Sequence, residues 1–149
     1  MVANKPTIFN VIRNKDKTFI EKEIASKKYD LNVVDDYGYS PIFSAVHDEN
    51  VFLTKLLIEN GAAFKDKTRS KDIFCDPLHI AARRAFLSIV KLLVEREANV
   101  SAIDAVSKTP IWYAFLQYRH SLPILNPIVN KICLFLIDHG ASFLESEAK

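Results

Sequence analysis

The sequence predicts an all-α solenoid in which helix–turn–helix units stack on one another and carry β-turn fingers. Proline-led stretches recur at intervals of 36 and 33 residues, starting at Pro41, Pro77 and Pro110. An apolar run begins twelve residues after each of the first two prolines, and a similar run at residues 132–137 follows the third proline ten residues late. A period near 33 residues with two helices per unit is typical of a stacked repeat array.

The second unit carries the fullest version of the pattern. It reads Asp76-Pro77-Leu78-His79-Ile80-Ala81-Ala82, and the other units match it at residues 40–45 and 109–114. These stretches resemble the ankyrin repeat, with its Thr-Pro-Leu-His turn and the Gly-Ala pair after its second helix, found here at residues 61–62 and 140–141. The resemblance covers nearly the whole chain. It implies an array that binds proteins through variable surface positions.

We expect a single ankyrin-repeat domain over the whole chain, residues 1–149, with about four repeats. A degenerate capping repeat comes first, two regular repeats follow, and the last repeat is modified by an insertion. The expected bounds are 1–34, 35–70, 71–103 and 104–146, with the insertion near 118–128.

The start and end of each repeat follow from local chemistry. Ser40, Asp76 and Thr109 are natural N-caps because each precedes a proline that suits the first helical turn. Glycine at the end of the second helix suits the left-handed C-cap position. In the repeat at residues 71–103, Glu97 replaces that glycine, so we expect it to carry about 1 kcal/mol of backbone strain.

The capping repeat is predicted to contain two short helices. The first spans Thr7 to Arg13. Thr18 and Glu21 form a capping box that opens the second, where the hydroxyl and the carboxylate pair with otherwise unsatisfied amides. The following repeats are predicted to place helices at residues 41–47, 51–60, 77–84, 87–96, from 110 onwards and 127–138.

The insertion in the last repeat has two interpretations. Pro123 and Pro127 argue against one continuous helix across it, so a lengthened first helix and a loop are expected. The loop is either specific to a partner or a hydrophobic lid over the last repeat that buries Leu122, Ile124 and Leu125.

Composition and charge narrow the function classes. Apolar residues make up 49% of the chain and charged residues 26%, with a net charge of +2. The net charge is +3 in residues 1–34, −3 in 35–67 and +2 in 68–103, and the remainder is balanced. This alternation argues against a continuous stripe that follows a phosphate backbone, so nucleic-acid binding is disfavoured.

The sequence favours an intracellular protein. No apolar run approaches the roughly 20 residues that span a bilayer, and the N-terminus lacks the apolar segment of a signal peptide. Cys75 and Cys133 are not spaced as metal ligands, so reduced thiols are expected. We expect a cytoplasmic protein, with the nucleus as an alternative, that does not enter membranes and is a monomer when unbound.

No catalytic, cofactor or metal motif is present. Glycine-rich phosphate loops and the Gly-x-Ser-x-Gly elbow do not occur. His79 occupies the histidine position of the repeat turn, where the resemblance implies hydrogen bonds to neighbouring turns. His47, His120 and His139 form no ligand motif with one another or with a cysteine. We therefore expect no enzyme, no cofactor and no metal site.

The resemblance places a partner on the turn tips and on the exposed side of the first helices. Tyrosine and arginine dominate binding hot spots; the alternative is that the tyrosines stack on neighbouring turns and the arginines pair with acids. Trp112 is interpreted as packing between turns, with a binding anchor as the alternative. The candidate residues are Asp36, Tyr37, Tyr39, His47, Asp48, Asp72, Ile73, Arg83, Arg84, Lys108, Leu116 and Gln117.

Overall fold

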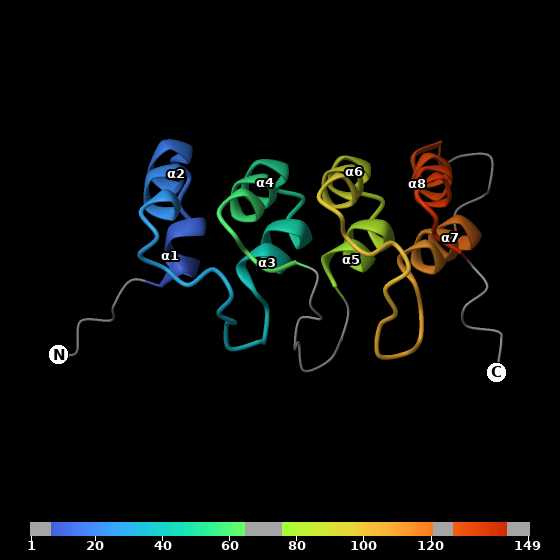
Figure 1. Cartoon of the computed structure of the whole chain (residues 1–149), viewed down its shortest axis with the longest axis horizontal. Coiled ribbons are helices and arrows are strands. Elements are labelled where there is room, and N and C mark those ends of the chain that lie inside the picture. Colours follow the sequence, from blue (N-terminus) through green and yellow to red (C-terminus); the bar gives the residue numbers. More distant parts are fainter. Residues whose placement is uncertain (1–6, 65–75, 121–126, 143–149) are drawn as a thin grey trace.

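The described part of the chain consists of helices joined by turns and loops (Figure 1). The computed structural model describes residues 7–64, 76–120 and 127–142, and for residues 117–120 it describes the backbone alone. Within these ranges no residue forms a strand. The helices are α1 (Ile8–Ile12), α2 (Lys17–Ala25), α3 (Pro41–His47), α4 (Val51–Glu59), α5 (Pro77–Arg83), α6 (Leu87–Glu95), α7 (Pro110–His120) and α8 (Pro127–Asp138).

The helices form pairs that stack side by side into a solenoid. In Figure 1 the first helices of the pairs, α1, α3, α5 and α7, lie in one row, and the second helices lie in another. Connecting segments project beyond the row of first helices, as β-turn fingers would. The all-α solenoid predicted from the sequence is therefore confirmed.

Proline and a polar cap start the first helices of the regular repeats. The Ser40 hydroxyl accepts a hydrogen bond from the Phe43 amide at 3.3 Å. The Asp76 carboxylate accepts hydrogen bonds from the Leu78 and His79 amides at 3.0 and 3.2 Å. Because proline follows each cap, its missing N–H leaves no donor unpaired. The N-caps predicted at Ser40 and Asp76 are confirmed, and the one at Thr109 stays a prediction.

The predicted capping box at Thr18 is wrong. Helix α2 begins two residues earlier, at Lys17, and Asp16 is its N-cap. The Asp16 carboxylate accepts from the Thr18 and Phe19 amides at 2.9 and 3.3 Å and from the Thr18 hydroxyl at 2.6 Å. A carboxylate next to the positive end of the helix dipole is a better acceptor than a hydroxyl, so Asp16 takes the cap position from Thr18.

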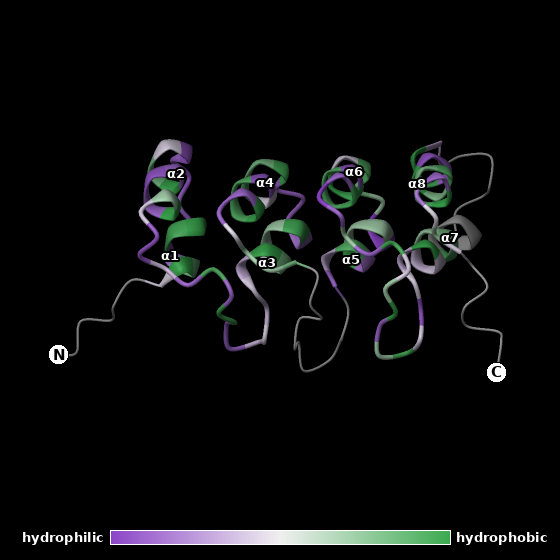
Figure 2. Ribbon diagram, in the orientation of Figure 1, coloured by the Kyte–Doolittle hydropathy of each residue, from purple (hydrophilic) through white to green (hydrophobic). Residues whose placement is uncertain are grey.

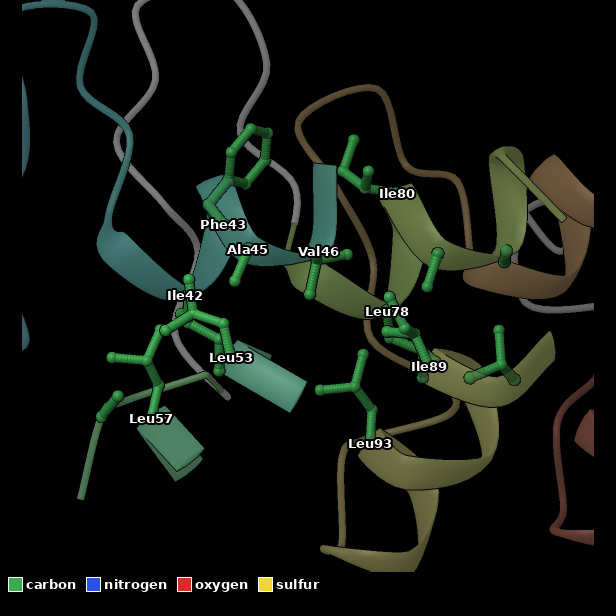
Figure 3. Close-up of a cluster of buried hydrophobic side chains, with 14 of the residues drawn as sticks. Ile42, Phe43, Ala45, Val46, Leu53, Leu57, Leu78, Ile80, Ile89 and Leu93 are labelled. Atoms are coloured by element: carbon green, nitrogen blue, oxygen red, sulfur yellow. The ribbon is translucent and has the colours of Figure 1, made fainter. Parts of the chain in front are cut away.

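The core runs through the stack, between the pairs as well as within them. Figure 3 shows apolar side chains of α3, α4, α5 and α6 gathered into one cluster. Burying one such side chain contributes about 1.5–3 kcal/mol, and small alanines let neighbouring helices approach closely. In Figure 2, α2 is largely hydrophilic, whereas α4 and α6 are mostly hydrophobic. The side chains with 1% or less of their surface exposed include Ile42, Ala45, Leu57, Leu78, Ala81, Ala82, Ile89, Leu93, Ile111, Ile132 and Leu136.

In the three repeats after the capping repeat, a left-handed residue follows the second helix, as Lys27, with φ of 54°, does in the capping repeat. Gly61 and Gly140 have φ of 92° and 89°, and Glu97 has φ of 63°. In each case the next residue donates its amide to a carbonyl of the last helical turn, as Ala98 does to Leu93 at 2.9 Å. The expected positive φ of Glu97 is confirmed. A residue with a side chain is expected to lose about 1 kcal/mol in this conformation.

We predict that Gly61→Ala lowers the free energy of unfolding by about 1 kcal/mol. A Cβ added at Gly61 meets no atom within 4 Å, so the loss comes from the positive φ alone. Urea unfolding followed by circular dichroism measures it. Ser88→Ala, at an exposed position of α6, is the control and should change stability by less than about 0.5 kcal/mol. Equal transition midpoints for both variants would contradict the assignment.

Candidate protein-binding surface

The finger at residues 35–39 follows the capping repeat, and one carboxylate holds its backbone. The Asp35 carboxylate accepts from the Tyr37 and Tyr39 amides, both at 2.9 Å. The Asp35 amide donates to the Tyr39 carbonyl at 3.0 Å, and Gly38 takes φ of 83° at the turn. These bonds leave Tyr37 at the tip with 73% of its surface exposed, beside the exposed Asp36. The finger thus presents an aromatic and an acidic side chain on a fixed backbone.

The finger before the last repeat repeats this arrangement. The Asp104 carboxylate accepts from the Val106 and Lys108 amides, both at 2.9 Å, and from the Tyr113 hydroxyl. The Lys108 ammonium lies 4.8 Å from the centre of the Trp112 ring. Trp112 is half-buried and meets Tyr113 edge-on, with ring centres 5.1 Å apart. Both observations favour the packing interpretation of Trp112.

Tyr39 is part of the scaffold as much as of the surface. Its ring stacks on that of Phe43, with centres 4.6 Å apart and planes 4° from parallel. Phe43 is only 3% exposed, so it fixes the position of the tyrosine. The centre of the Tyr37 ring lies 6.3 Å from that of Tyr39, and Tyr37 stays exposed to solvent. The stacking interpretation therefore describes Tyr39, although its partner lies in its own repeat and not in a neighbouring turn.

A polar chain links α3 to α5 on the exposed side of the first helices. The Nδ1 of His47 lies 3.1 Å from the Asp48 carboxylate. The Arg84 guanidinium donates to the Nε2 of His47 at 2.5 Å. Arg83 is exposed and has no ion-pair partner in the described part of the chain. The alternative that both arginines pair with acids is not seen among these residues, since Arg84 meets a histidine.

The remaining candidates are placed unevenly. Lys108 and the half-buried Leu116 belong to the last repeat, and Gln117 lies in α7 where only the backbone is described. Asp72 and Ile73 lie outside the described residues, as does most of the insertion whose two interpretations remain open. The assignment of all twelve residues to a binding surface stays a prediction.

Sequence reasoning missed the part that α1 plays in this surface. A pocket of about 440 Å³ opens between α1 and α3, and it reaches the start of α4. Its α1 side is formed by Phe9, Ile12 and Arg13, which the sequence suggested only as parts of a capping helix. The finger carboxylates were missed too, although Asp35 and Asp104 each stand six residues before the proline of their repeat.

His79 joins the repeat at residues 71–103 to the finger before the last repeat. Its Nδ1 lies 2.7 Å from the Asp76 carboxylate, and its Nε2 lies 3.0 Å from the Lys108 carbonyl. Burial on its own would lower the pKa of His79, but the hydrogen bond and charge of Asp76 outweigh it and raise the pKa above the usual value. The protonated ring satisfies both acceptors, and the expected structural role is confirmed.

Metal-binding and membrane features do not add to this surface. The described residues contain no group of three or more histidine, cysteine or acidic side chains able to hold a metal ion. Among these residues, no helix has both the length and the apolar character to cross a bilayer.

Comparison with known proteins identifies the repeats. Residues 8–104 match the model of ankyrin repeats, described as three copies. The chain is 37% identical to alpha-latrotoxin-Lg1a of Latrodectus geometricus over 117 residues, which is 78% of this chain and 8% of the toxin. It is 31% identical to neurogenic locus notch homolog protein 1 of Xenopus tropicalis over 96 residues, 62% of this chain and 4% of that protein. A putative ankyrin repeat protein of Fowlpox virus is 26% identical over 161 residues, covering 90% of this chain and 35% of the viral protein.

We predict that protonation of His79 stabilises the fold. Its pKa is higher folded than unfolded, so the contribution is complete below the unfolded value of about 6.5 and is lost as the pH rises through the folded value. The free energy of unfolding should therefore fall more steeply from about pH 6 to about pH 8 in the wild type than in His79→Gln. Urea unfolding at several pH values measures both slopes. The other histidines are common to both proteins, so parallel curves would contradict the prediction.

Proposed function

This chain belongs to the ankyrin-repeat family, and from that premise we propose that it binds a partner protein through its fingers and the exposed side of α1, α3 and α5. Ankyrin repeats are in general protein-interaction modules without catalysis. The proposal extends this to the surface described above and to an intracellular setting. The bound protein is held, and no bond in it is changed.

The observation that carries the proposal is a set of exposed side chains that the fold does not need. Tyr37 and Asp36 stand on a finger whose shape depends on Asp35 and Gly38. Arg83 is the exposed last residue of α5, whose other six residues are all buried, and it has no ion pair in the described residues. Tyrosine and arginine bury large areas and form several hydrogen bonds, so they suit the centre of an interface.

The biological use of the binding is a finer proposal. The chain acts as a host-directed or decoy inhibitor that occupies a surface which a larger partner needs. The alignment with a viral ankyrin repeat protein along 90% of this chain supports it.

A second candidate is that the repeats serve as an adaptor or as one segment of a longer scaffold. The chain spans about 8% of the length of the spider toxins that it matches, which favours this candidate. The mass of the native polypeptide in its source cells, measured by immunoblot, separates the two. A mass near 16.9 kDa supports the inhibitor, and a much larger mass supports the scaffold.

We predict that Tyr37→Ala combined with Arg83→Ala weakens binding of the partner about tenfold or more. Tyr37 is chosen over Tyr39 because the stack of Tyr39 on Phe43 would make its loss destabilising. Affinity capture from cell lysates, quantified by mass spectrometry, identifies proteins held by the wild type and lost with the double variant.

The matched control is Lys55→Ala with Lys131→Ala, which changes two exposed residues of the second helices α4 and α8. It should retain the partner, and circular dichroism should show that both variants keep the wild-type helix content. A partner retained by the finger variant and lost by the control would move the binding site to the second helices.

A further inference from the structure

The pocket between α1 and α3 is lined by aromatic and aliphatic side chains together with polar ones. Phe9 and Ile12 of α1 line one side, and Tyr39 and Phe43 line the other, with Leu53 of α4 beneath. Figure 3 shows the Phe43 ring on the side of α3 away from Leu53, and Phe43 belongs to the buried core cluster. A volume of about 440 Å³ lies in the range of pockets that bind defined groups, about 300–1,000 Å³.

The aromatic wall of this pocket is fixed before anything binds. The Tyr39 and Phe43 rings are stacked in parallel, and the Tyr39 amide is bonded to the Asp35 carboxylate. Helix α1 has five residues and α3 has seven, and the hollow lies between them. A rigid apolar pocket suits a large aromatic side chain, because that side chain loses little conformational entropy when it enters.

The charged groups considered at and beside the pocket are three arginines and one carboxylate, so their balance is positive. Arg13 stands on its rim, and Arg83 and Arg84 end the next first helix. The only carboxylate that lines it, Asp48, lies within hydrogen-bond distance of the His47 ring. The Arg84 guanidinium donates to the Nε2 of that ring, and no acid in the described residues contacts it directly. Asp48 keeps 74% of its side chain exposed, so three arginines stand against one accessible carboxylate. Charge complementarity therefore selects a partner with carboxylates.

The spacing between the pocket and the arginines sets the length of the partner segment. Packed helices lie about 8–10 Å apart, so the end of α5 is about 10–20 Å from the hollow between α1 and α3. An extended peptide advances about 3.3 Å per residue. An acidic residue about three to six positions from the aromatic one would reach Arg83 or Arg84.

We propose that this pocket binds an aromatic anchor of an acidic peptide segment in a partner protein, with carboxylates of that segment on Arg83 and Arg84. The inference rests on the proposed function, because it assumes that the row of first helices faces the partner. It adds the chemistry of the ligand: one aromatic side chain, followed by carboxylates.

The probe is a random library of peptides about twelve residues long, displayed on phage and selected on the immobilised protein. The expected peptides carry Trp, Tyr or Phe with Asp or Glu about three to six residues away. Enrichment of basic peptides, of peptides without an aromatic residue, or of none at all would overturn the proposal.

Variants then locate the enriched peptide. Ser44→Phe fills the pocket and should weaken binding about tenfold or more, as Phe9→Ala should by removing the opposite wall. Two pocket variants keep the test valid if one of them fails to fold. Arg83→Glu should weaken binding at low salt and lose its effect at high salt, since exposed charges are screened.

Lys131→Glu makes the same charge change on α8 and should leave binding unaltered. Equal losses from Arg83→Glu and Lys131→Glu would overturn the placement of the acid. If the captured partner is lost with Tyr37→Ala and Arg83→Ala but binds folded Ser44→Phe normally, the pocket fails and the proposed function stands. If the captured partner binds the variant with Tyr37→Ala and Arg83→Ala as tightly as it binds the wild type, the proposed function itself fails.

Discussion

A single constraint underlies this fold: no helix pair buries its apolar faces alone, so each repeat depends on its neighbours. Ile42 and Leu57 of one repeat, and Leu78 and Ile89 of the next, belong to one cluster that crosses the junction between repeats. The alanines at the contacts between first helices, such as Ala45 and Ala81, let these helices approach. The repeats then stabilise one another along the stack. Side chains outside the core cluster are not needed for packing.

The released positions become useful because the backbone beneath them is rigid. One aspartate in each described finger satisfies several backbone amides, and His79 ties the second turn to the carbonyl of Lys108 in the next finger. A partner that meets Tyr37 or Arg83 does not have to order the loops first, which lowers the entropy lost on binding. The fold thus supplies a preorganised surface, and the exposed side chains on that surface differ from one repeat to the next.

The repeat signals predicted most of the fold, because they act through local physics. Proline after Ser40 or Asp76, glycine after a second helix and a twelve-residue offset to an apolar run depend only on nearby residues, and the helices lie within a residue or two of their predicted bounds. Asp16 was missed because Asp16 and Thr18, two residues apart, are both suitable N-caps, and only the geometry decides between them. The pocket beside α1 was beyond prediction for another reason: its lining comes from α1, a finger, α3 and the start of α4, and no local pattern brings these residues together.

The electrostatic character of the surface also could not be read from formal charge. Residues 35–67 carry a net charge of −3, yet the pocket there is flanked by arginines. The fold uses some of its carboxylates: Asp35 holds a finger, and Glu59 pairs with Arg96 on the second helices. Asp48 stays exposed beside the pocket, but three arginines at the ends of the first helices outnumber it and match the short acidic peptide proposed above. A nucleic-acid backbone would need a continuous basic stripe, so local pairing, and not repeat-by-repeat charge, determines the kind of partner that fits.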